Sequence, residues 1–517
     1  MESEYQSFIK ALRAGKKPEF SPDSKSIDYA RKLDAQDKLR ALRNNFNIPS
    51  RRSLRTRALD GSTPGTVAAF PPRECHADFA LGAVSHQTSS NGKTVDDDRP
   101  SIYFVGNSLG AQPKCIRQYL DAQLEAWASI GVNGHFTSLD NSPLTAWQDM
   151  AADCAQKSVD LVGAASPSEV IYMNTLTVNL HLMMASFYRP TAKRHKIIAE
   201  WKPFPSDSYA ISSQLQWHGL SPSTSLIEIQ PEPDTLYIPT ERILSIIDEH
   251  ADSTALLLLP GIQYYTGQLF NIPLITAHAR RHGITVGWDL AHAVGNVELA
   301  LHEWGVDFAV WCTYKYLNAG PGAIAGCFVH ERHHHHLNDS KVVNGGVEGK
   351  RGEYVPRLAG WYGADKAVRF NMEKEFVPAA GAHGWQVSNP SAMDLACVGA
   401  ALSVFGQTRM AELREKGMVL TGYLEWLLKG LLEEEEGQEP AFRIITPASP
   451  LERGSQLSLL LRSGLLQKVS EWLAEAGVVV DVRKPDVVRV TPVPMYCEFE
   501  DVWEFIDVFR RALKEAQ

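Results

Sequence analysis

Residues 284–296 read I-T-V-G-W-D-L-A-H-A-V-G-N, and C-T-Y-K-Y follows at residues 312–316. The apolar runs 284–288 and 307–312 each have the length and composition of a buried strand. Asp289 ends the first run and Lys315 lies just beyond the second. The interval between them has room for one short helix. The segment is therefore predicted to be a β-α-β unit with its chemistry at the carboxyl ends of the strands.

A carboxylate and a lysine in this arrangement predict a binding site for pyridoxal phosphate. The lysine amine forms a Schiff base with the cofactor aldehyde. The carboxylate keeps the pyridine nitrogen protonated, so that the ring can act as an electron sink. Asp289 and Lys315 would fill these two roles. The alternative is an aspartate that caps a helix and an unrelated surface lysine.

The composition is that of a large intracellular enzyme. The chain has 517 residues, 44% of them apolar, and a net charge of −9, so no basic field attracts nucleic acid or an anionic membrane. The N-terminus has no apolar signal segment and no stretch reaches membrane-span length. A cytoplasmic location is expected, because the seven scattered cysteines include no C-x-x-C pair and suggest free thiols in a reducing compartment.

The order of predicted elements divides the chain into three parts. Residues 1–105 hold a helix at 27–43 and a loop or insertion at 56–100 that is rich in Gly, Ser, Thr, Pro and Asp. Residues 106–388 form an α/β domain, and residues 389–517, together with the N-terminal segment, form a smaller α+β domain. In the large domain we predict helices at 149–161, 176–188 and 240–249, and strands at 169–173, 196–200, 225–229 and 255–259 of a mainly parallel sheet. In the C-terminal part we predict helices at 393–405, 411–432 and 465–476, and strands at 456–461 and 487–491.

Two polar residues accompany the aspartate and the lysine. The phenol of Tyr314 could bond a phosphate or relay a proton, although a half-buried loop tyrosine would look the same. His292 follows Asp289 by three residues and could meet it on one helical turn. Its ring could orient the carboxylate or contact the phenolic oxygen of the cofactor. The alternative is a helix-start histidine bonded to the backbone.

Two helix starts could complete the cofactor site. M-N-T-L-T at 173–177 lies between a strand and a helix and offers free N–H groups and hydroxyls to a phosphate. F-P-S-D at 204–207 offers a ring that could stack on the pyridine and an aspartate that could cap the helix or contact the cofactor. Ordinary helix capping and core packing explain both segments almost as well. No metal site is expected at His333–His336, since four consecutive histidines do not converge on one ion.

Further motifs accumulate along the chain: Y-F-V-G-N-S-L-G (103–110), N-T-L-T-V-N-L-H (174–181), Y-T-G-Q (265–268), G-W-Y-G (360–363) and V-S-N-P-S (387–391). Together with the segments quoted above they resemble the kynureninase family, which belongs to the pyridoxal phosphate enzymes of fold type I. The resemblance runs from Ile27 to the C-terminus, with interruptions at 56–100 and 340–354. Each motif alone is shared with other families, whereas the full set is highly specific.

The resemblance implies a role for individual residues. Lys315 would be the Schiff-base lysine, Asp289 the partner of the pyridine nitrogen, and Tyr314 both a cofactor contact and the candidate acid/base. The remaining cofactor contacts would be Leu176, Thr177, Phe204, Pro205, Ser206, Asp207 and His292, joined by Trp361 and Asn389 from the other subunit of a homodimer with shared active sites. The substrate pocket would include Ser108, His135, Asn389 and Arg489, with Arg489 clamping the substrate carboxylate.

The resemblance also implies a reaction. Members of the family hydrolyse the Cβ–Cγ bond of L-kynurenine or 3-hydroxy-L-kynurenine and release alanine and an anthranilate, in tryptophan catabolism and NAD biosynthesis. Ser388-Asn389 and His135 resemble the eukaryotic branch, which favours the 3-hydroxy substrate. Alternatives are another fold-type-I enzyme, an aminotransferase or a cysteine desulfurase, and a cofactor-binding regulator without turnover. Two departures stand out: Pro260 replaces a serine, and Ala364 replaces the histidine that commonly follows G-W-Y-G.

Overall fold

A seven-stranded sheet forms the centre of the computed structural model, which describes residues 3–56, 98–232, 235–334, 342–343, 346–347, 355–372, 374, 376–434 and 439–516. The strand order is β4-β10-β9-β8-β7-β5-β6, and all neighbours are parallel except β10, which is antiparallel to β4 and β9. The mainly parallel sheet is thus confirmed, while β10 was not predicted. The strands are β4 (Val170–Tyr172), β5 (Lys196–Glu200), β6 (Leu226–Ile229), β7 (Thr254–Pro260), β8 (Thr285–Asp289), β9 (Phe308–Trp311) and β10 (Gly326–Val329).

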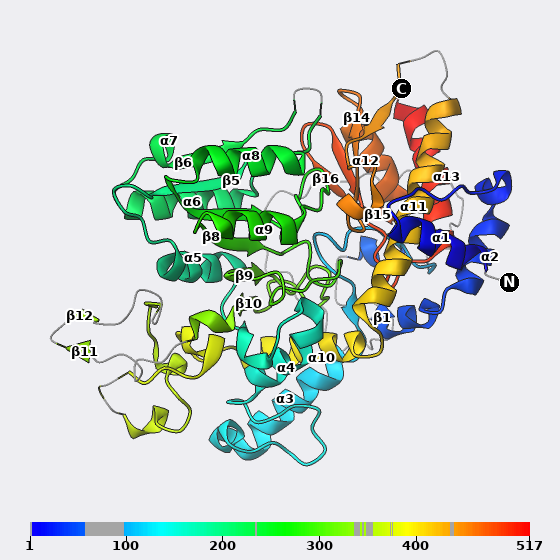
Figure 1. Cartoon of the computed structure of the whole chain (residues 1–517). Helices are drawn as coiled ribbons and strands as arrows, with labels where there is room; N and C mark the ends of the chain where they lie inside the picture. Colours follow the sequence, from blue (N-terminus) through cyan, green and yellow to red (C-terminus); the bar gives the residue numbers. More distant parts are fainter. Residues whose placement is uncertain are drawn as a thin grey trace, which may run out of the picture.

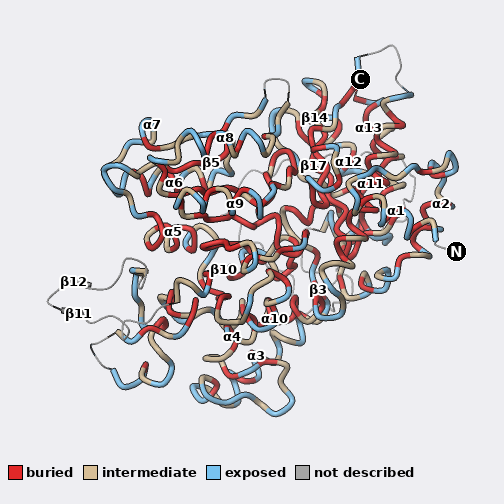
Figure 2. The backbone as a smooth tube through the Cα atoms, viewed as in Figure 1, coloured by how far each residue is buried: buried red, intermediate tan, exposed pale blue. Residues whose placement is uncertain are grey.

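Helices flank this sheet, with α5 beside α6 and α8 beside α9 (Figure 1). The helices in this part of the fold are α3 (Ile116–Ile130), α4 (Met150–Val162), α5 (Leu176–Phe187), α6 (Pro205–Trp217), the short α7 (Pro222–Ser225), α8 (Thr240–His250) and α9 (Ile272–Arg281), and α10 (Ala392–Phe405) from the C-terminal part packs against α3 and α4. The predicted helices at 149–161, 176–188, 240–249 and 393–405 are confirmed to within a few residues. Strands β8 and β9 are buried along nearly their whole length, in the central part of the tube that Figure 2 colours as buried. Helices cover the sheet, as is usual for a mainly parallel one.

The connection between β8 and β9 differs from the prediction. It contains turns but no α-helix, so the expected short helix is wrong. The chain forms a turn directly after β8, in which the N–H of Ala293 donates to the carbonyl of Leu290. Gly295 then adopts a left-handed φ of 77°, which ends any helical run. The two strand ends nevertheless bring Asp289 and Lys315 to the same edge of the sheet, where both line one cavity.

A second, antiparallel sheet lies in the C-terminal part, with strand order β13-β14-β17-β16. Its strands are β13 (Phe442–Ile444), β14 (Leu457–Leu461), β16 (Asp481–Arg483) and β17 (Val487–Val490), and the helices α11 (Met410–Glu434), α12 (Leu466–Glu475) and α13 (Phe499–Ala516) accompany it. The N-terminal helices α1 (Glu4–Arg13) and α2 (Ile27–Gln36) pack against α11 and α13 (Figure 1). Aromatic contacts between Phe8, Phe20 and Tyr423 form part of this junction.

The N-terminal prediction holds only in part. The helix expected over 27–43 ends at Gln36 and continues after a turn as a 3-10 helix, and α1 was not predicted. Short strands complete the described fold: β1 (Phe46–Asn47), β2 (Ile102–Tyr103), β3 (Gln112–Pro113), β11 (Val342–Val343), β12 (Gly346–Val347) and β15 (Val478–Val479). The predicted insertion at 56–100 and the extra residues at 340–354 lie almost wholly outside the described residues. Among the helices that are described, none is long and apolar enough to cross a membrane.

Candidate active site

A cavity of about 260 Å³ opens at the carboxyl edge of the large sheet, where β5, β7 and β8 end. Ligands of open α/β sheets bind at this edge because the connecting loops there leave a crevice. The end of β8, the starts of α5 and α6 and the loops after β8 and β9 bring together nine residues that the sequence singled out. These residues are Leu176, Thr177, Phe204, Ser206, Asp207, Asp289, His292, Tyr314 and Lys315.

Two buried carboxylates face each other in the wall of this cavity. Asp289 ends β8 and accepts the backbone N–H of Ala291 at 2.7 Å, while Asp207 lies in the first turn of α6. Burial and the charge of Asp289 raise the pKa of Asp207 well above its usual value. Burial also raises the pKa of Asp289, partly offset by the positive charge of Lys315. Such a pair is stabilised by a cationic N–H donor placed between the carboxylates and the lysine.

His292 adds a polar atom that lacks a partner. Its Nδ1 is buried and has no hydrogen bond within the described part of the chain. Burial, together with the charge of Lys315, lowers the pKa of His292 well below its usual value, so the ring stays neutral at physiological pH. A buried nitrogen without a partner costs free energy unless a ligand supplies the hydrogen bond. This atom therefore points to a polar ligand in the cavity.

The Lys315 amine lies near two aromatic rings. Its Nζ is 5.7 Å from the ring centre of Phe204 and 5.9 Å from that of Tyr314. Phe204 itself meets Tyr264 edge to face, with 5.2 Å between the ring centres. Burial raises the pKa of Tyr314, so its phenol stays protonated and can donate a proton. A flat ring bound to Lys315 would have Phe204 as a stacking surface.

The start of α5 provides an anion site beside the lysine. Its N-cap residue, Thr175, makes no side-chain capping hydrogen bond, so the first N–H groups of the helix remain available. Asn174 precedes it with a left-handed φ of 45°, and Asn179 fixes this turn by donating to the carbonyl of Met173 at 2.8 Å. Leu176 and Thr177 line the cavity from this turn. A phosphate would be held by the helix N-terminus and the Thr177 hydroxyl.

The G-N-S-L-G loop at 106–110 packs against the backbone of the segment that carries Lys315. The N–H of Gly110 donates to the carbonyl of Tyr314 at 2.8 Å. A Cβ at Gly110 would lie only 2.3 Å from the carbonyl oxygen of Lys315, so any larger residue would push the lysine segment out of place. Ser108 is half-buried in this loop but does not line the cavity.

Other predicted site residues also lie away from the cavity wall. Arg489 is 1% exposed, and its guanidinium already makes a two-bond pair with Asp481 (3.0 and 2.8 Å) and donates to the carbonyl of Tyr264 at 2.8 Å. His135 contacts Trp147 edge to face. Pro205 is the first residue of α6, and both Trp361 and Asn389 are exposed at the surface of the single chain.

The two departures have different settings. Pro260 ends β7 and lines the cavity, and the next residue, Gly261, donates its N–H to the backbone carbonyl of Asp289 at 2.7 Å. The backbone packing at this position is thus present although the proline offers no hydroxyl. Ala364 forms an isolated bridge with Pro378, and its carbonyl accepts from Arg369 at 3.0 Å.

Sequence reasoning missed four residues of the cavity wall: Glu200, Ile262, Tyr264 and Ala291. Glu200 is the most informative of them, because it is 1% exposed and burial raises its pKa to about 7. Its carboxylate accepts from the N–H of Lys202 at 2.7 Å and from Gln263 at 3.2 Å. The signal in the sequence that could have identified it was its position, a charged residue at the end of an apolar strand.

These features fit pyridoxal phosphate. The paired carboxylates suit a protonated pyridine nitrogen, the free Nδ1 of His292 suits a polar oxygen, and the start of α5 suits the phosphate. Phe204 suits the ring face, and the Lys315 amine is the one that would join the aldehyde. The donor set was predicted from sequence, and the structure brings its central members to one place.

Comparisons with known proteins agree with this site. A model of the aminotransferase class-V family matches residues 110–348, and a model of the kynureninase C-terminal domain matches residues 413–509. Among solved structures, an apo cysteine desulfurase from Thermococcus onnurineus has a TM-score of 0.62 at 14% identity and covers 80% of this chain and 95% of its own. The cystine C–S lyase C-DES has a TM-score of 0.60 at 18% identity, with coverage of 79% and 97%. At these identities the likeness shows the fold, which is that of the pyridoxal phosphate enzymes of fold type I.

Much closer relatives exist among curated fungal proteins. Kynureninase 2 of Chaetomium globosum is 66% identical over 99% of this chain and 99% of its own length. Kynureninase 1 of Neurospora crassa is 62% identical over 99% of this chain and 100% of its own length, and the kynureninase of Pyricularia oryzae is 60% identical over 96% of each. Pyridoxal phosphate is accordingly the cofactor of this chain, as the sequence predicted. The chain belongs to the kynureninase family.

Proposed function

We propose that this chain hydrolyses the Cβ–Cγ bond of L-kynurenine and 3-hydroxy-L-kynurenine, yielding L-alanine and anthranilate or 3-hydroxyanthranilate. The observation that carries the proposal is the cavity shared by Lys315, Asp289 and Asp207 in a chain 66% identical to a kynureninase along its length. The reaction would serve tryptophan degradation towards NAD. Hydrolysis of kynurenine can be followed directly, because the anthranilate released is fluorescent.

When bound, the cofactor supplies an electron sink for the bond-breaking steps. The protein supplies the proton transfers. The Lys315 amine is placed to remove the proton from the substrate α-carbon. Asp289, assisted by Asp207, would stabilise a positive charge at the pyridine nitrogen of a bound cofactor, and such stabilisation is strongest in a buried site. His292 stays neutral and can accept a hydrogen bond without adding a second positive charge beside Lys315.

Later steps need an acid, and Tyr314 is the best-placed one. Water adds to the side-chain ketone, the Cβ–Cγ bond breaks, and the remaining three-carbon fragment takes up a proton before it leaves as alanine. Because burial raises its pKa, the Tyr314 phenol holds its proton until a strong base develops nearby. Tyr314 lies next to Lys315 in the cavity wall, so the two groups can act on adjacent carbons.

The substrate pocket involves residues beyond the cavity wall. We propose that Ser108, His135, Asn389 and Arg489 complete it. Arg489 has the fork geometry that suits a carboxylate, and its charge lies close enough to lower the pKa of His292. Asp481 occupies that fork here, so substrate binding would require Arg489 to exchange or share these hydrogen bonds.

The rival functions are separable by one assay. A cysteine desulfurase needs an activated cysteine, but burial raises the pKa of Cys397 to about 11 and makes Cys497 a still weaker acid. An aminotransferase would transfer the amino group to a keto acid, and a regulator would do neither. The holoenzyme mixed with kynurenine alone should release anthranilate in many turnovers. Absence of anthranilate fluorescence, or its dependence on an added keto acid, would refute hydrolysis.

We also propose that the active unit is a homodimer with shared sites. Trp361 is 50% exposed and Asn389 is exposed in the single chain, as expected of residues that serve a neighbouring subunit. Mixing inactive Lys315→Ala chains with inactive Asn389→Ala chains under exchange should restore part of the activity, because one site of each mixed dimer is intact. Lack of rescue despite proven exchange would place both residues in one chain's site.

The preference between the two substrates is a finer proposal. We expect a higher kcat/KM on 3-hydroxykynurenine, because Asn389 and His135 can each bond the extra ring hydroxyl. Asn389→Thr should reduce this preference more than it slows kynurenine cleavage. Equal specificity constants in the unmodified enzyme would contradict the proposal.

Location and domain organisation complete the proposal. We place the enzyme in the cytosol, supported by six cysteines that form no disulfide in the described part of the chain. We further propose that residues 106–388 act as the cofactor-binding domain. Residues 389–517 and the N-terminal segment would form the smaller domain, supported by the packing of α1 and α2 on α11 and α13.

A further inference from the structure

Two histidines at the C-terminal end of α9, His278 in its last turn and the C-cap residue His282, contact one aspartate of α8 away from the cofactor cavity. His278 and His282 are four residues apart and therefore lie on one face at the end of the helix. The Nε2 of His278 lies 2.6 Å from Oδ1 of Asp248, and the Nε2 of His282 lies 2.8 Å from the same oxygen. The three potential ligand atoms therefore lie within 4.8 Å of one another.

The surroundings suit a cation. Asp248 lies in the last turn of α8, and His278 and His282 lie at the end of α9, so two helix C-termini direct their partial negative charge here. The side chain of Asp248 is 54% exposed and that of His282 is 35% exposed, which leaves access for an ion and its water ligands. Two imidazoles and one carboxylate match the ligand set of zinc sites.

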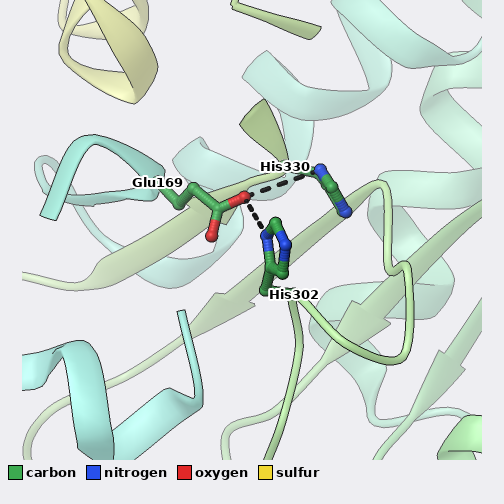
Figure 3. A group of neighbouring side chains, drawn as sticks. All are labelled: Glu169, His302 and His330. Atoms are coloured by element: carbon green, nitrogen blue, oxygen red, sulfur yellow. Dashed lines mark hydrogen bonds and ion pairs between the residues drawn. The ribbon is translucent and has the colours of Figure 1, made fainter. Parts of the chain in front are cut away.

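A second group of possible metal ligands, Glu169 with His302 and His330, differs from the α8–α9 group in its surroundings (Figure 3). Glu169 is fully buried and already accepts the N–H groups of Ala165 (2.7 Å) and Glu331 (2.8 Å). The rings of His302 and His330 are stacked, with 4.6 Å between their centres and 30° between their planes. At the α8–α9 site the ring planes of the two histidines are inclined by 57° instead.

We propose that Asp248, His278 and His282 form a binding site for a divalent transition-metal ion of the zinc class, which joins α8 to α9. The ion would take Nε2 of each histidine and Oδ1 of the aspartate, with water as the fourth ligand. In the ion-free chain Nδ1 of His278 accepts from Arg281 at 2.8 Å. Metal binding at Nε2 moves the ring proton to Nδ1, so the exposed Arg281 side chain must turn away.

The site lies at the edge of the sheet opposite the cofactor. Helices α8 and α9 lead directly into β7 and β8, so their C-terminal ends lie beside the beginnings of those strands. Asp289 and the cavity lie at the other ends of the same strands. Substitutions at the metal site should therefore leave turnover unchanged, and activity serves as a test of correct folding.

Calorimetric titration of the holoenzyme with Zn²⁺ tests the proposal. The double variant His278→Asn/His282→Asn should lose one equivalent of bound zinc, whereas the matched control His302→Asn should bind as much zinc as the unmodified enzyme. Asp248→Asn should weaken that binding event by about tenfold or more. Zinc should raise the melting temperature of the unmodified protein but not of the double variant, and Mg²⁺ should do neither. An active double variant with unchanged zinc stoichiometry, or a His302→Asn variant that loses the equivalent, would overturn the assignment.

Discussion

Asp289 and Asp307 lie at opposite ends of the same pair of strands and are almost equally buried, at 7% and 6% exposure. Asp307 precedes β9 and accepts hydrogen bonds from the N–H of Val286 (2.8 Å) and from Arg332 (2.7 Å), with His333 also 2.8 Å away. Burial alone would raise its pKa, but His333 and Arg332 outweigh burial and lower it. Asp289 has one backbone donor and a second carboxylate beside it, and its pKa is raised.

The difference in pKa distinguishes a carboxylate that stabilises the fold, Asp307, from one that we expect to act in the reaction, Asp289. Asp307 is satisfied within the protein, so the free energy of its contacts stabilises the fold. Asp289 and Asp207 are buried next to each other and both have raised pKa values, so a cationic ligand beside them would be stabilised by both carboxylates. A buried carboxylate with raised pKa at the carboxyl edge of a parallel sheet is therefore a better sign of function than burial itself.

The largest expected effect is that of Lys315→Ala. The amine at the cavity is lost, so covalent attachment of the cofactor and turnover should both disappear. The matched control is Lys202→Ala, which removes a nearby lysine whose Nζ lies 4.0 Å from the ring centre of Tyr265. Absorbance of the bound cofactor and anthranilate release should be measured for both. A Lys315→Ala enzyme that keeps turning over would refute the role of this lysine.

The comparison itself predicts opposite effects for the two aspartates. Asp289→Asn should fold normally and lower kcat by about 10²–10³, since a charge preorganised for the reaction is removed. Asp307→Asn should keep kcat but lose about 3–5 kcal/mol of unfolding free energy, because Arg332 and His333 lose their partner. Urea unfolding and steady-state kinetics on both variants measure the two quantities. If each variant changed both quantities alike, the distinction would fail.

The ionisations of Asp207 and Asp307 should also have opposite effects on the free energy of unfolding as pH changes. Because the folded pKa of Asp207 is raised, its ionisation destabilises the apoenzyme at neutral pH, and the penalty fades as pH falls through that value. Asp207→Asn should therefore stabilise the apoenzyme at pH 8 by on the order of 1 kcal/mol, with less gain near pH 5. The depressed pKa of Asp307 gives stability above the unfolded pKa of about 4, lost as pH falls further.

Thermal unfolding of the Asp207→Asn and Asp307→Asn apoenzymes, and of the unmodified apoenzyme, should be measured from pH 8 downwards. An Asp207→Asn apoenzyme that is less stable at pH 8 than the unmodified apoenzyme would show that the carboxylate pair is satisfied without a ligand.

The smallest expected effect is at Glu200. This carboxylate holds the turn that carries Tyr264, because Gln263 donates to Glu200 and accepts the N–H of Tyr265. Glu200→Gln should lower kcat/KM by less than about tenfold and abolish an ionisation near pH 7 in the pH profile. A variant with that ionisation intact would assign it to another group.

The sequence predicted the chemistry better than the connections. The strand ends at Asp289 and Lys315 follow from local apolar runs, and the structure places both in one cavity. The helix between them was wrong, since Gly295 and the turn bonds depend on packing that periodicity does not report. Strand β10 was missed because Gly326–Val329 is too short for an alternating pattern.

Residues brought to the site from a distance were the hardest to predict. Arg489 comes from the second sheet, and its pairing with Asp481 depends on the register of β16 and β17. Trp361 and Asn389 lie on the surface of the single chain, and the roles proposed for them would need a second copy of the chain, which no local sequence pattern describes. Glu200 was overlooked because a charge at a strand end looks like an ordinary exposed terminus until burial is known.

The central claim is that Lys315, which lines the same cavity as Asp289 and Asp207, is the residue that binds the cofactor. Reduction of the holoenzyme with borohydride fixes pyridoxal phosphate to its lysine, and mass spectrometry of the digested protein locates the label. We predict a single modified peptide, the one containing Lys315, at one label per chain. A label on Lys202 or any other lysine, with Lys315 unmodified, would contradict this account.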